Sequence, residues 1–464
     1  MALHTKKVDG DGSHGQQLAV DPLLAGEVES VPKHRLPDGP MTPDMAYQII
    51  HDELMFDGNA RLNLATFVTT HMEPEAERLM AETFDKNMID KDEYPQTAEL
   101  EMRCVNMLSR LWNSPDADEA TGCSTTGSSE AAMLGGLALK RRWQQRRRAA
   151  GESTERPNMV MGINVQICWE KFCNYFEVEP RYVPMEGNRF HLNGEEAVKL
   201  CDENTIGVVA VLGSTFDGSY EPVAEISDAL DDLQERTGLD VPIHVDGASG
   251  GMVAPFIDPD LVWDFRLPRV ASINTSGHKY GRVYPGVGWA IWRDPEALPE
   301  DLVFRVNYLG GDMPTFALNF SRPGSQIVAQ YYNFLRLGFE GYRRVQQECR
   351  DVATYGAAAI AELGPFELIT DGSELPVFAF KVRDGVDNFS AYDVSGGMRE
   401  SGWQVPAYTF PENREDLVAL RVVVRSGYSR DIADMFLDDL KRVLVRLEKQ
   451  PSPTHDESST GFSH

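Results

Sequence analysis

Three short motifs carry side chains that could cooperate in one reaction. The stretch Ser276–Lys279 ends in His278 and a lysine, and it follows an apolar segment. Asp246 ends another apolar segment, and Ser128 and Ser129 follow a glycine where a helix is predicted to begin. Each motif alone has an ordinary explanation: a solvated lysine, a buried salt bridge and a helix cap. Their occurrence in one chain indicates a common site.

A cofactor with an aldehyde, a ring nitrogen and a phosphate would use all three motifs. The Lys279 amine would form a Schiff base with the aldehyde. The Asp246 carboxylate would keep the ring nitrogen protonated, so that the ring could accept electrons. Backbone N–H groups and hydroxyls at Ser128 and Ser129 would bind phosphate at the positive end of a helix. We therefore predict a pyridoxal 5'-phosphate site with Lys279, Asp246 and His278 as its catalytic residues.

Apolar stretches that alternate with helical patterns must position these motifs. Strands are predicted at 158–167, 205–213, 241–246, 270–274 and 287–292, with helices at 128–148 and 223–236. Such alternation predicts a mainly parallel sheet with helices on both faces, where ligands bind beyond the carboxyl ends of the strands. After residue 350, strand-like stretches at 377–382 and 420–424 predict a smaller α+β domain. We divide the chain into an N-terminal arm (1–61), a large domain (62–349), a small domain (350–450) and a tail (451–464).

The composition argues against several classes of protein. The 464 residues carry a formal net charge of −28, which disfavours binding to nucleic acid and to anionic lipid. No apolar stretch is long enough to span a membrane, and the N-terminus lacks the apolar region of a secretory signal. The six cysteines form no CxxC pair, which favours reduced thiols in a cytoplasmic protein and no metal site.

Longer motifs relate the chain to a known family. They are NLATF (63–67), DKNMIDKDEYP (85–95), GSSEAAMLGG (127–136), VQICWEKF (165–172), WDFRLPRV (263–270), SGHK (276–279) and FSRP (320–323). With these motifs the chain resembles the group II pyridoxal-phosphate decarboxylases, most closely the bacterial glutamate decarboxylases. The resemblance implies an α/β, fold-type I transferase-like structure: a mainly parallel seven-stranded sheet in the large domain and a small α+β C-terminal domain. It also implies a homo-oligomer, with the dimer as the minimum unit and a hexamer as an alternative.

The resemblance implies roles for individual residues as well. The cofactor would be bound by Ser128, Ser129, Gln166, Thr215, Asp246, Ser276, His278, Lys279 and Ser321. Of these, Gln166 would stack on the ring and Ser321 would come from the neighbouring subunit. The substrate would be bound by Thr66, Phe67 and Arg421, with Asn87 and Asp90 from the partner chain. Arg421 would hold the α-carboxylate.

The implied reaction is the α-decarboxylation of L-glutamate to γ-aminobutyrate and carbon dioxide, which consumes a proton. An acidic pH optimum and a role in acid resistance would follow. Glu170 stands where related bacterial enzymes carry a histidine, and His464 ends a tail that would plug the site at neutral pH. Three alternatives stay open: a decarboxylase of another amino acid, a fold-type I aminotransferase, and a catalytically silent cofactor-binding protein.

Overall fold

The computed structural model describes residues 33–115, 117–306 and 313–454. The chain divides into two compact units at Ala60. The first unit contains helix α1 (Pro43–Leu54), which begins after Thr42, whose hydroxyl accepts a hydrogen bond from the Met45 amide. Proline is suited to the first helical position because its missing N–H would have had no partner there. None of the α1 residues is buried.

The second unit, from Arg61 onward, contains all of the strands described below. Its strands are β1 (Thr121–Thr125), β2 (Asn158–Gly162), β3 (Glu179–Val183), β4 (Thr205–Val211), β5 (Ile243–Asp246), β6 (Val270–Thr275), β7 (Gly288–Trp292), β8 (Phe304–Val306), β9 (Met313–Thr315), β10 (Phe366–Leu368), β11 (Val377–Val382), β12 (Ala407–Thr409) and β13 (Val418–Val423). Its α-helices are α2 (Pro74–Glu82), α3 (Pro95–Leu111), α4 (Ser128–Ala149), α5 (Ile167–Tyr175), α6 (Gly194–Lys199), α7 (Val223–Thr237), α8 (Ala254–Ile257), α9 (Ser325–Ala361, kinked at Gly338), α10 (Ala391–Glu400) and α11 (Arg430–Leu447). Short 3-10 turns occur at η2 (Ala117–Glu119), η3 (Gly250–Met252), η4 (Pro295–Ala297) and η5 (Glu300–Leu302), while η1 (Ala60–Leu62) lies at the division between the units.

The large sheet has seven strands in the order β1-β7-β6-β5-β4-β2-β3. Its members from β6 to β3 pair in parallel, whereas β7 is antiparallel to both β6 and β1. The prediction of a mainly parallel seven-stranded sheet is therefore confirmed. The strand predicted at 287–292 does not continue the parallel series, because only a loop joins it to β6 and a parallel return needs a long crossover.

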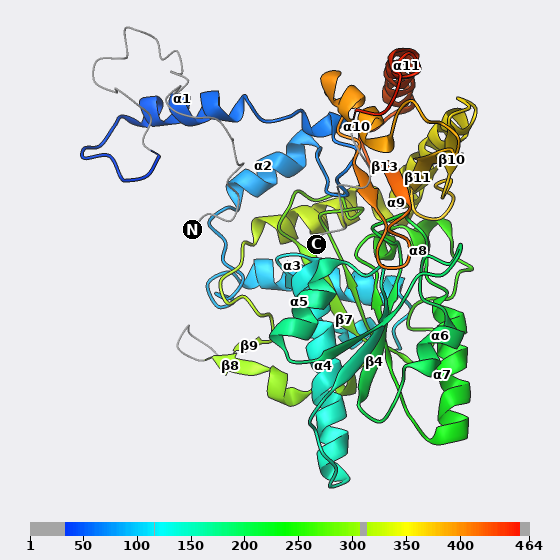
Figure 1. Cartoon of the computed structure of the whole chain (residues 1–464). Helices are drawn as coiled ribbons and strands as arrows, with labels where there is room; N and C mark the ends of the chain where they lie inside the picture. Colours follow the sequence, from blue (N-terminus) through cyan, green and yellow to red (C-terminus); the bar gives the residue numbers. More distant parts are fainter. Residues whose placement is uncertain (1–32, 116, 307–312, 455–464) are drawn as a thin grey trace. The chain divides into compact units, whose positions relative to one another are not determined.

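The directions of these strands bring the ends of six strands, all except β7, to one edge of the sheet. Since β1 and β6 are both antiparallel to β7, they point the same way as each other and as β2, β4 and β5. Figure 1 shows the strands of this sheet among the helices of the large domain. The loops that follow β1, β2, β4, β5 and β6 thus begin at a common edge, where ligands bind in sheets of this kind.

The strand predicted at 158–167 was wrong in its second half, because β2 ends at Gly162 and α5 begins at Ile167. The side chain of Gln166 accepts a hydrogen bond of 2.7 Å from the Cys168 amide and so caps this helix. An N-cap of this type satisfies an amide that has no partner within the helix.

The two faces of the large sheet are covered by different helices. All seven residues of β4 are buried. Alternate residues face opposite sides: Val208 and Ala210 belong to the core cluster that includes residues of α7, whereas Val209 belongs to the cluster that includes residues of α4 and α5. A strand buried on both faces reads as a continuous apolar stretch, and this is why it was recognisable in the sequence.

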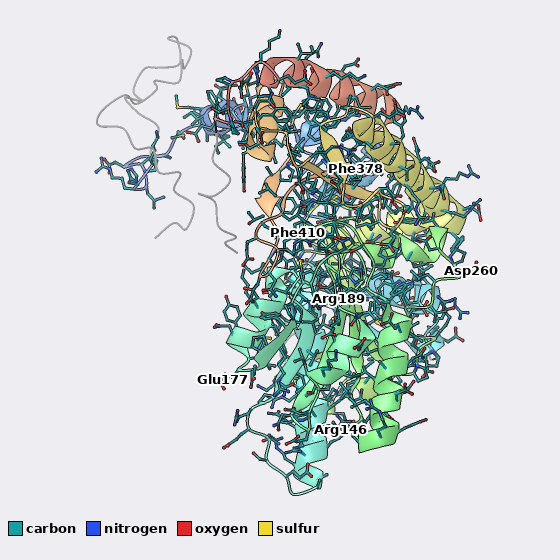
Figure 2. The ribbon with its side chains drawn as sticks, turned by 45° about the vertical axis from the view of Figure 1, so that its right-hand side comes forward. Arg146, Glu177, Arg189, Asp260, Phe378 and Phe410 are labelled. Atoms are coloured by element: carbon teal, nitrogen blue, oxygen red, sulfur yellow. The ribbon has the colours of Figure 1, made fainter. Side chains whose placement is uncertain are left out.

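The region predicted as the small domain contains an antiparallel sheet in the order β10-β11-β13-β12, which packs on a core cluster of its own. Residues of α10, α11 and the second half of α9 belong to that core together with Phe378 and Phe380. Figure 2 shows Phe378 in this domain and Arg146 near the far end of α4. None of the helices that the structure describes combines the length and the apolar character that a membrane crossing requires.

Candidate active site

Five predicted site residues lie at or just beyond the ends of strands at the common edge. Ser128 follows β1, Gln166 follows β2, Thr215 follows β4, Asp246 ends β5, and Lys279 follows β6. In the register of β5 and β6, Asp246 lies opposite Asn274, shortly before the loop that carries the lysine. The topology therefore brings together residues that are far apart in the sequence.

The surroundings of the Lys279 amine include a hydroxyl, an aromatic ring and an acid. Its Nζ donates a hydrogen bond of 3.3 Å to the hydroxyl of Ser249 and lies 5.1 Å from the centre of the Phe67 ring. Loss of hydration lowers the pKa of Lys279, and the negative charge of Asp246 opposes this effect in part. A lysine with a lowered pKa presents more of the neutral amine, the form that attacks a carbonyl.

The segment around Phe67 crosses over the lysine loop. Thr69 donates from its amide to the carbonyl of His278 at 2.8 Å and from its hydroxyl to the carbonyl of Lys279 at 2.7 Å. The hydroxyl of Thr66 accepts a hydrogen bond from the Val68 amide at 3.1 Å. These bonds fix the backbone on both sides of Phe67, which is buried.

The carboxylate of Asp246 accepts hydrogen bonds from three donors. Trp169 Nε1 donates to Oδ2 at 2.8 Å, while Asn274 Nδ2 and the Ala248 amide donate to Oδ1 at 3.0 Å and 3.1 Å. Asp246 itself is buried. Donors to a carboxylate stabilise its negative charge, so this group suits a cationic partner such as a protonated ring nitrogen.

The turn that opens α4 has the properties of a phosphate site. Its N-cap, Gly127, has no side chain to bond the first amides of the helix. The hydroxyl of Ser276 donates to that of Ser128 at 2.7 Å, and a Cβ added at Gly127 would lie 3.1 Å from the ring of His278. Burial and the charge of Lys279 lower the pKa of His278 to about 4. The ring is therefore neutral at mildly acidic pH.

Arg421 lies in β13 of the small domain and is buried rather than part of a surface ion pair. Its guanidinium lies 4.8 Å from the centre of the Phe67 ring and 5.5 Å from that of Tyr408. It donates to the carbonyl of Thr215 and, at 2.7 Å, to that of Ala65. A cation held beside the lysine pocket in this way is suited to binding an anionic substrate group.

The residues predicted to act on a neighbouring subunit form a separate cluster. Asn87 donates from Nδ2 to the Ser321 hydroxyl at 3.3 Å and accepts from the Arg322 amide at 3.1 Å. Asp90 lies one turn farther along, where its amide donates to the carbonyl of Asn87. Their described contacts are with one another and with nearby segments rather than with Lys279 or Asp246.

Sequence reasoning overlooked four residues of the site. They are Ser249 beside the lysine amine, Trp169 and Asn274 on Asp246, and Tyr408 on Arg421. Trp169 lies within the motif VQICWEKF, so the sequence could have indicated that this residue belongs to the site. It could not have indicated that Trp169 donates a hydrogen bond to Asp246. Glu170 is half-buried in α5, where its charge adds to the effect of burial in raising the pKa of Tyr182. His464 lies outside the described residues.

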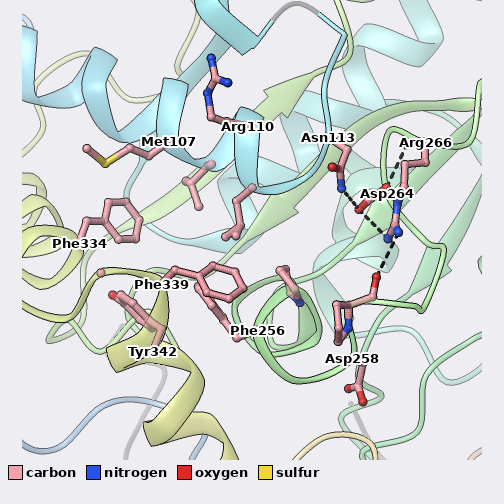
Figure 3. Close-up of a pocket in the computed structure, with 15 residues that line it drawn as sticks. Met107, Arg110, Asn113, Phe256, Asp258, Asp264, Arg266, Phe334, Phe339 and Tyr342 are labelled. Carbon is pink, nitrogen blue, oxygen red and sulfur yellow. Dashed lines mark hydrogen bonds and ion pairs between the residues drawn. The ribbon is translucent and has the colours of Figure 1, made fainter.

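A cavity of about 550 Å³ lies elsewhere, between α3, α8 and α9 (Figure 3). Its lining is mostly apolar, with Met107, Phe256 and Phe339 among its residues. The carboxylate of Asp264, one of the lining residues, accepts hydrogen bonds from Asn113 at 2.8 Å and from Arg266. Since its lining includes none of the predicted site residues, the cavity does not bear on their chemistry.

The residues at the sheet edge fit a phosphorylated pyridine aldehyde. The fit rests on an amine whose pKa is lowered by burial, a buried carboxylate surrounded by donors, and an uncapped helix start with hydroxyls nearby. The Nδ1 atom of His278 is buried and has no hydrogen-bond partner among the described residues. A cofactor ring placed against this imidazole would leave the amine for its aldehyde, the carboxylate for its ring nitrogen and the helix start for its phosphate.

Comparisons with known proteins agree with this chemistry. The model of the pyridoxal-dependent decarboxylase conserved domain matches residues 37–383. A glutamate decarboxylase of Aliivibrio fischeri is 59% identical over 469 aligned residues, which cover 100% of both chains. One from Petunia hybrida is 49% identical over 91% of this chain and 85% of its own.

Solved structures agree as well. A glutamate decarboxylase of Lactobacillus brevis has a TM-score of 0.88 at 48% identity, covering 90% of this chain and 96% of its own. A sphingosine-1-phosphate lyase of Burkholderia pseudomallei shares the fold, with a TM-score of 0.76 at 22% identity over 92% of this chain and 96% of its own. Because the family model covers most of the sequence and close relatives match it along nearly its whole length, this chain belongs to the pyridoxal-dependent decarboxylases, and its cofactor is pyridoxal 5'-phosphate.

Proposed function

We propose that this chain removes the α-carboxyl group of L-glutamate, giving γ-aminobutyrate and carbon dioxide. One observation carries the proposal: the same Phe67 ring lies against both the Lys279 amine, 5.1 Å from its centre, and the Arg421 guanidinium, 4.8 Å from its centre. A substrate held by Arg421 would thus have its amino group at the lysine. The choice of glutamate is supported by the full-length similarity to a protein named as a glutamate decarboxylase.

Orientation of the substrate decides which bond breaks. Arg421 would bind the α-carboxylate and turn the Cα–carboxyl bond toward the face of the cofactor ring, which favours loss of carbon dioxide over loss of the α-proton. Pyridoxal phosphate, when bound, supplies an electron sink for the pair that this bond releases. Asp246 would stabilise the positive ring nitrogen, and Ser128, Ser129 and Ser276 would hold the phosphate.

The remaining assignments rest on the position of each side chain. Gln166 is exposed at the start of α5 and Thr215 is half-buried after β4, so both would contact the cofactor at the sheet edge. Thr66 and Phe67 would line the substrate side. Asn87, Asp90 and Ser321 would complete the site of a neighbouring subunit, which makes the functional unit at least a dimer.

Each turnover would consume a proton, because a proton replaces the carboxyl group at Cα. Burial and the charge of Lys279 lower the pKa of His278 to about 4, so its ring stays neutral in mild acid. We place the enzyme in the cytoplasm, in keeping with six cysteines that are all free thiols in the described structure.

The test is release of carbon dioxide from glutamate by the purified chain, with and without added pyridoxal phosphate, between about pH 4 and about pH 7. We expect release that depends on the cofactor, is faster at the acidic end, and is lost in Lys279→Ala. Reduction with borohydride followed by peptide mass spectrometry should place the cofactor on Lys279 in the parent protein.

The same assay separates the alternatives. Release from aspartate or an aromatic amino acid but not from glutamate would reassign the substrate. Formation of a keto acid without carbon dioxide would indicate an aminotransferase. Cofactor on Lys279 without turnover of any of these amino acids would indicate a catalytically silent protein and would overturn the proposal.

A further inference from the structure

A chain of buried polar side chains continues from Asp246 into the core of the large domain. Ser272, His244 and Asn274 lie on neighbouring strands β5 and β6, and all are buried. His244 Nδ1 lies 2.7 Å from Ser272 Oγ, and His244 Nε2 lies 2.7 Å from Asn274 Oδ1. Asn274 Nδ2 then donates to Asp246 at 3.0 Å. The carboxylate is the end of this chain.

The direction of every hydrogen bond in this series follows from the carboxylate at which the series ends. A carboxylate only accepts, so Asn274 must present its NH₂ group to Asp246 and its Oδ1 to His244. The imidazole must then carry its proton on Nε2, which leaves Nδ1 to accept from the hydroxyl of Ser272. Burial lowers the pKa of His244, in agreement with a neutral ring. Each group donates toward the carboxylate, and such bonds polarise one another.

Trp169 holds the other carboxylate oxygen. Its Nε1 donates to Asp246 Oδ2 at 2.8 Å, and its ring meets that of His244 edge-on with centres 5.1 Å apart. Gly135 of α4 allows the helix to pack directly against the His244 ring, because a Cβ at this position would lie 2.3 Å from that ring. Donors thus approach both oxygens of Asp246, and the groups that hold it are enclosed.

We infer that Asn274, His244 and Trp169 are positioning residues that hold the Asp246 carboxylate in place and aim it at the ring nitrogen of the cofactor. They act through Asp246 and would not contact the substrate themselves. The inference rests on the proposed function only in that it assigns Asp246 to the ring nitrogen. It predicts that their removal weakens the recognition of that nitrogen specifically.

The experiment compares two ligands that differ at one atom. Pyridoxal phosphate and its deaza analogue, in which a C–H group replaces the ring nitrogen, are titrated into the parent enzyme after the resident cofactor is removed, and into variants treated alike. We expect Trp169→Phe and Asn274→Leu to reduce the preference for pyridoxal phosphate over the analogue by about ten-fold, the range of one hydrogen bond to a charged group. Affinity for the analogue should change little.

Trp403→Phe is the matched control. Trp403 is also a buried indole that donates to a carboxylate at 2.8 Å, but its partner is Asp439 of the small domain. The Trp403→Phe variant should lose about as much thermal stability as Trp169→Phe, but its preference for pyridoxal phosphate over the analogue should not change. At position 244, His244→Gln keeps an amide donor for Asn274 and should retain the preference, whereas His244→Leu should reduce it.

Turnover provides a second readout. The variants should lower kcat for glutamate and leave KM nearly unchanged, since the altered groups do not contact the substrate. An unchanged ligand preference in both Trp169→Phe and Asn274→Leu, or an equal change in Trp403→Phe, would overturn the inference. Because the titration needs no catalysis, a parent enzyme that releases no carbon dioxide would contradict the proposed function alone.

Discussion

At the scale of single residues, the candidate site combines charged groups that are partly or fully shielded from water. Lys279 and Arg421 have lowered pKa values because burial disfavours their charged forms. Asp246 is surrounded by donors instead. The same fold thus makes protonation of Lys279 less favourable and surrounds the nearby Asp246 carboxylate with hydrogen-bond donors.

His278 should make the cofactor-free protein less stable in acid. Its pKa of about 4 in the folded chain lies below its ordinary value of 6.5, so the unfolded chain binds more protons between these two values. Stability therefore falls as the pH decreases from about 6.5 to about 4, by at most about 3 kcal/mol from this group. In His278→Asn the fall over this window should be smaller by that amount. Urea unfolding at a series of pH values measures it, and parallel curves for the two proteins would contradict the prediction.

Arg421→Lys should weaken glutamate binding by about ten-fold or more, because a lysine cannot present the two-pronged donor that fits a carboxylate. The product γ-aminobutyrate lacks the α-carboxylate and serves as the control ligand. Its inhibition constant should hardly change in the variant, while KM for glutamate rises. Equal losses for substrate and product would mean that the substitution had only disturbed the contacts of Arg421 with Thr215 and Ala65.

At the scale of elements, the alternation of apolar and helical segments was sufficient to predict the sheet and the edge where the site lies. A parallel strand is recognisable because both of its faces are buried, and ligand residues follow it directly. The direction of β7 was missed, since an apolar stretch does not record how the chain reaches it. Trp169 and Asn274 were missed because a hydrogen bond between distant segments leaves no local pattern.

Gly288 shows how closely two elements meet at the phosphate turn. A Cβ on this residue of β7 would lie 2.4 Å from the carbonyl carbon of Gly127 and 2.7 Å from the amide nitrogen of Ser128, both backbone atoms that cannot rotate away. Gly288→Ala should therefore displace the turn, costing about 1–3 kcal/mol of stability and weakening cofactor binding.

The exposed Gly396 of α10 provides the comparison for this substitution. No atom lies within 4 Å of a Cβ added there, so Gly396→Ala should leave cofactor affinity unchanged and stabilise the helix by up to about 1 kcal/mol. Thermal unfolding and cofactor titration on both variants measure these effects. Normal cofactor affinity in Gly288→Ala would show that the turn tolerates the shift.

At the scale of the whole molecule, the predicted site residues of one chain fall into two clusters. Lys279, Asp246 and Arg421 lie together, whereas Asn87 and Ser321 contact each other in a second cluster. Exposed apolar side chains, Phe84, Leu318 and Phe320, lie within three residues of Asn87 or Ser321 in the sequence. Apolar exposure of this kind is typical of a surface that meets another chain, which supports a dimer whose sites draw on both subunits.

Mixed dimers test this arrangement directly. Lys279→Ala and the double variant Asn87→Ala/Asp90→Asn should each be nearly inactive as homodimers. When the two chains are co-expressed with different tags and the mixed dimer is purified, one site combines an intact Lys279 with an intact Asn87 and Asp90 from the other chain. We expect that dimer to regain about half of the parent activity, since one of its two sites is complete. If all of these residues acted within one chain, neither site of the mixed dimer would be complete. Its activity would then stay at the level of the two inactive variant homodimers.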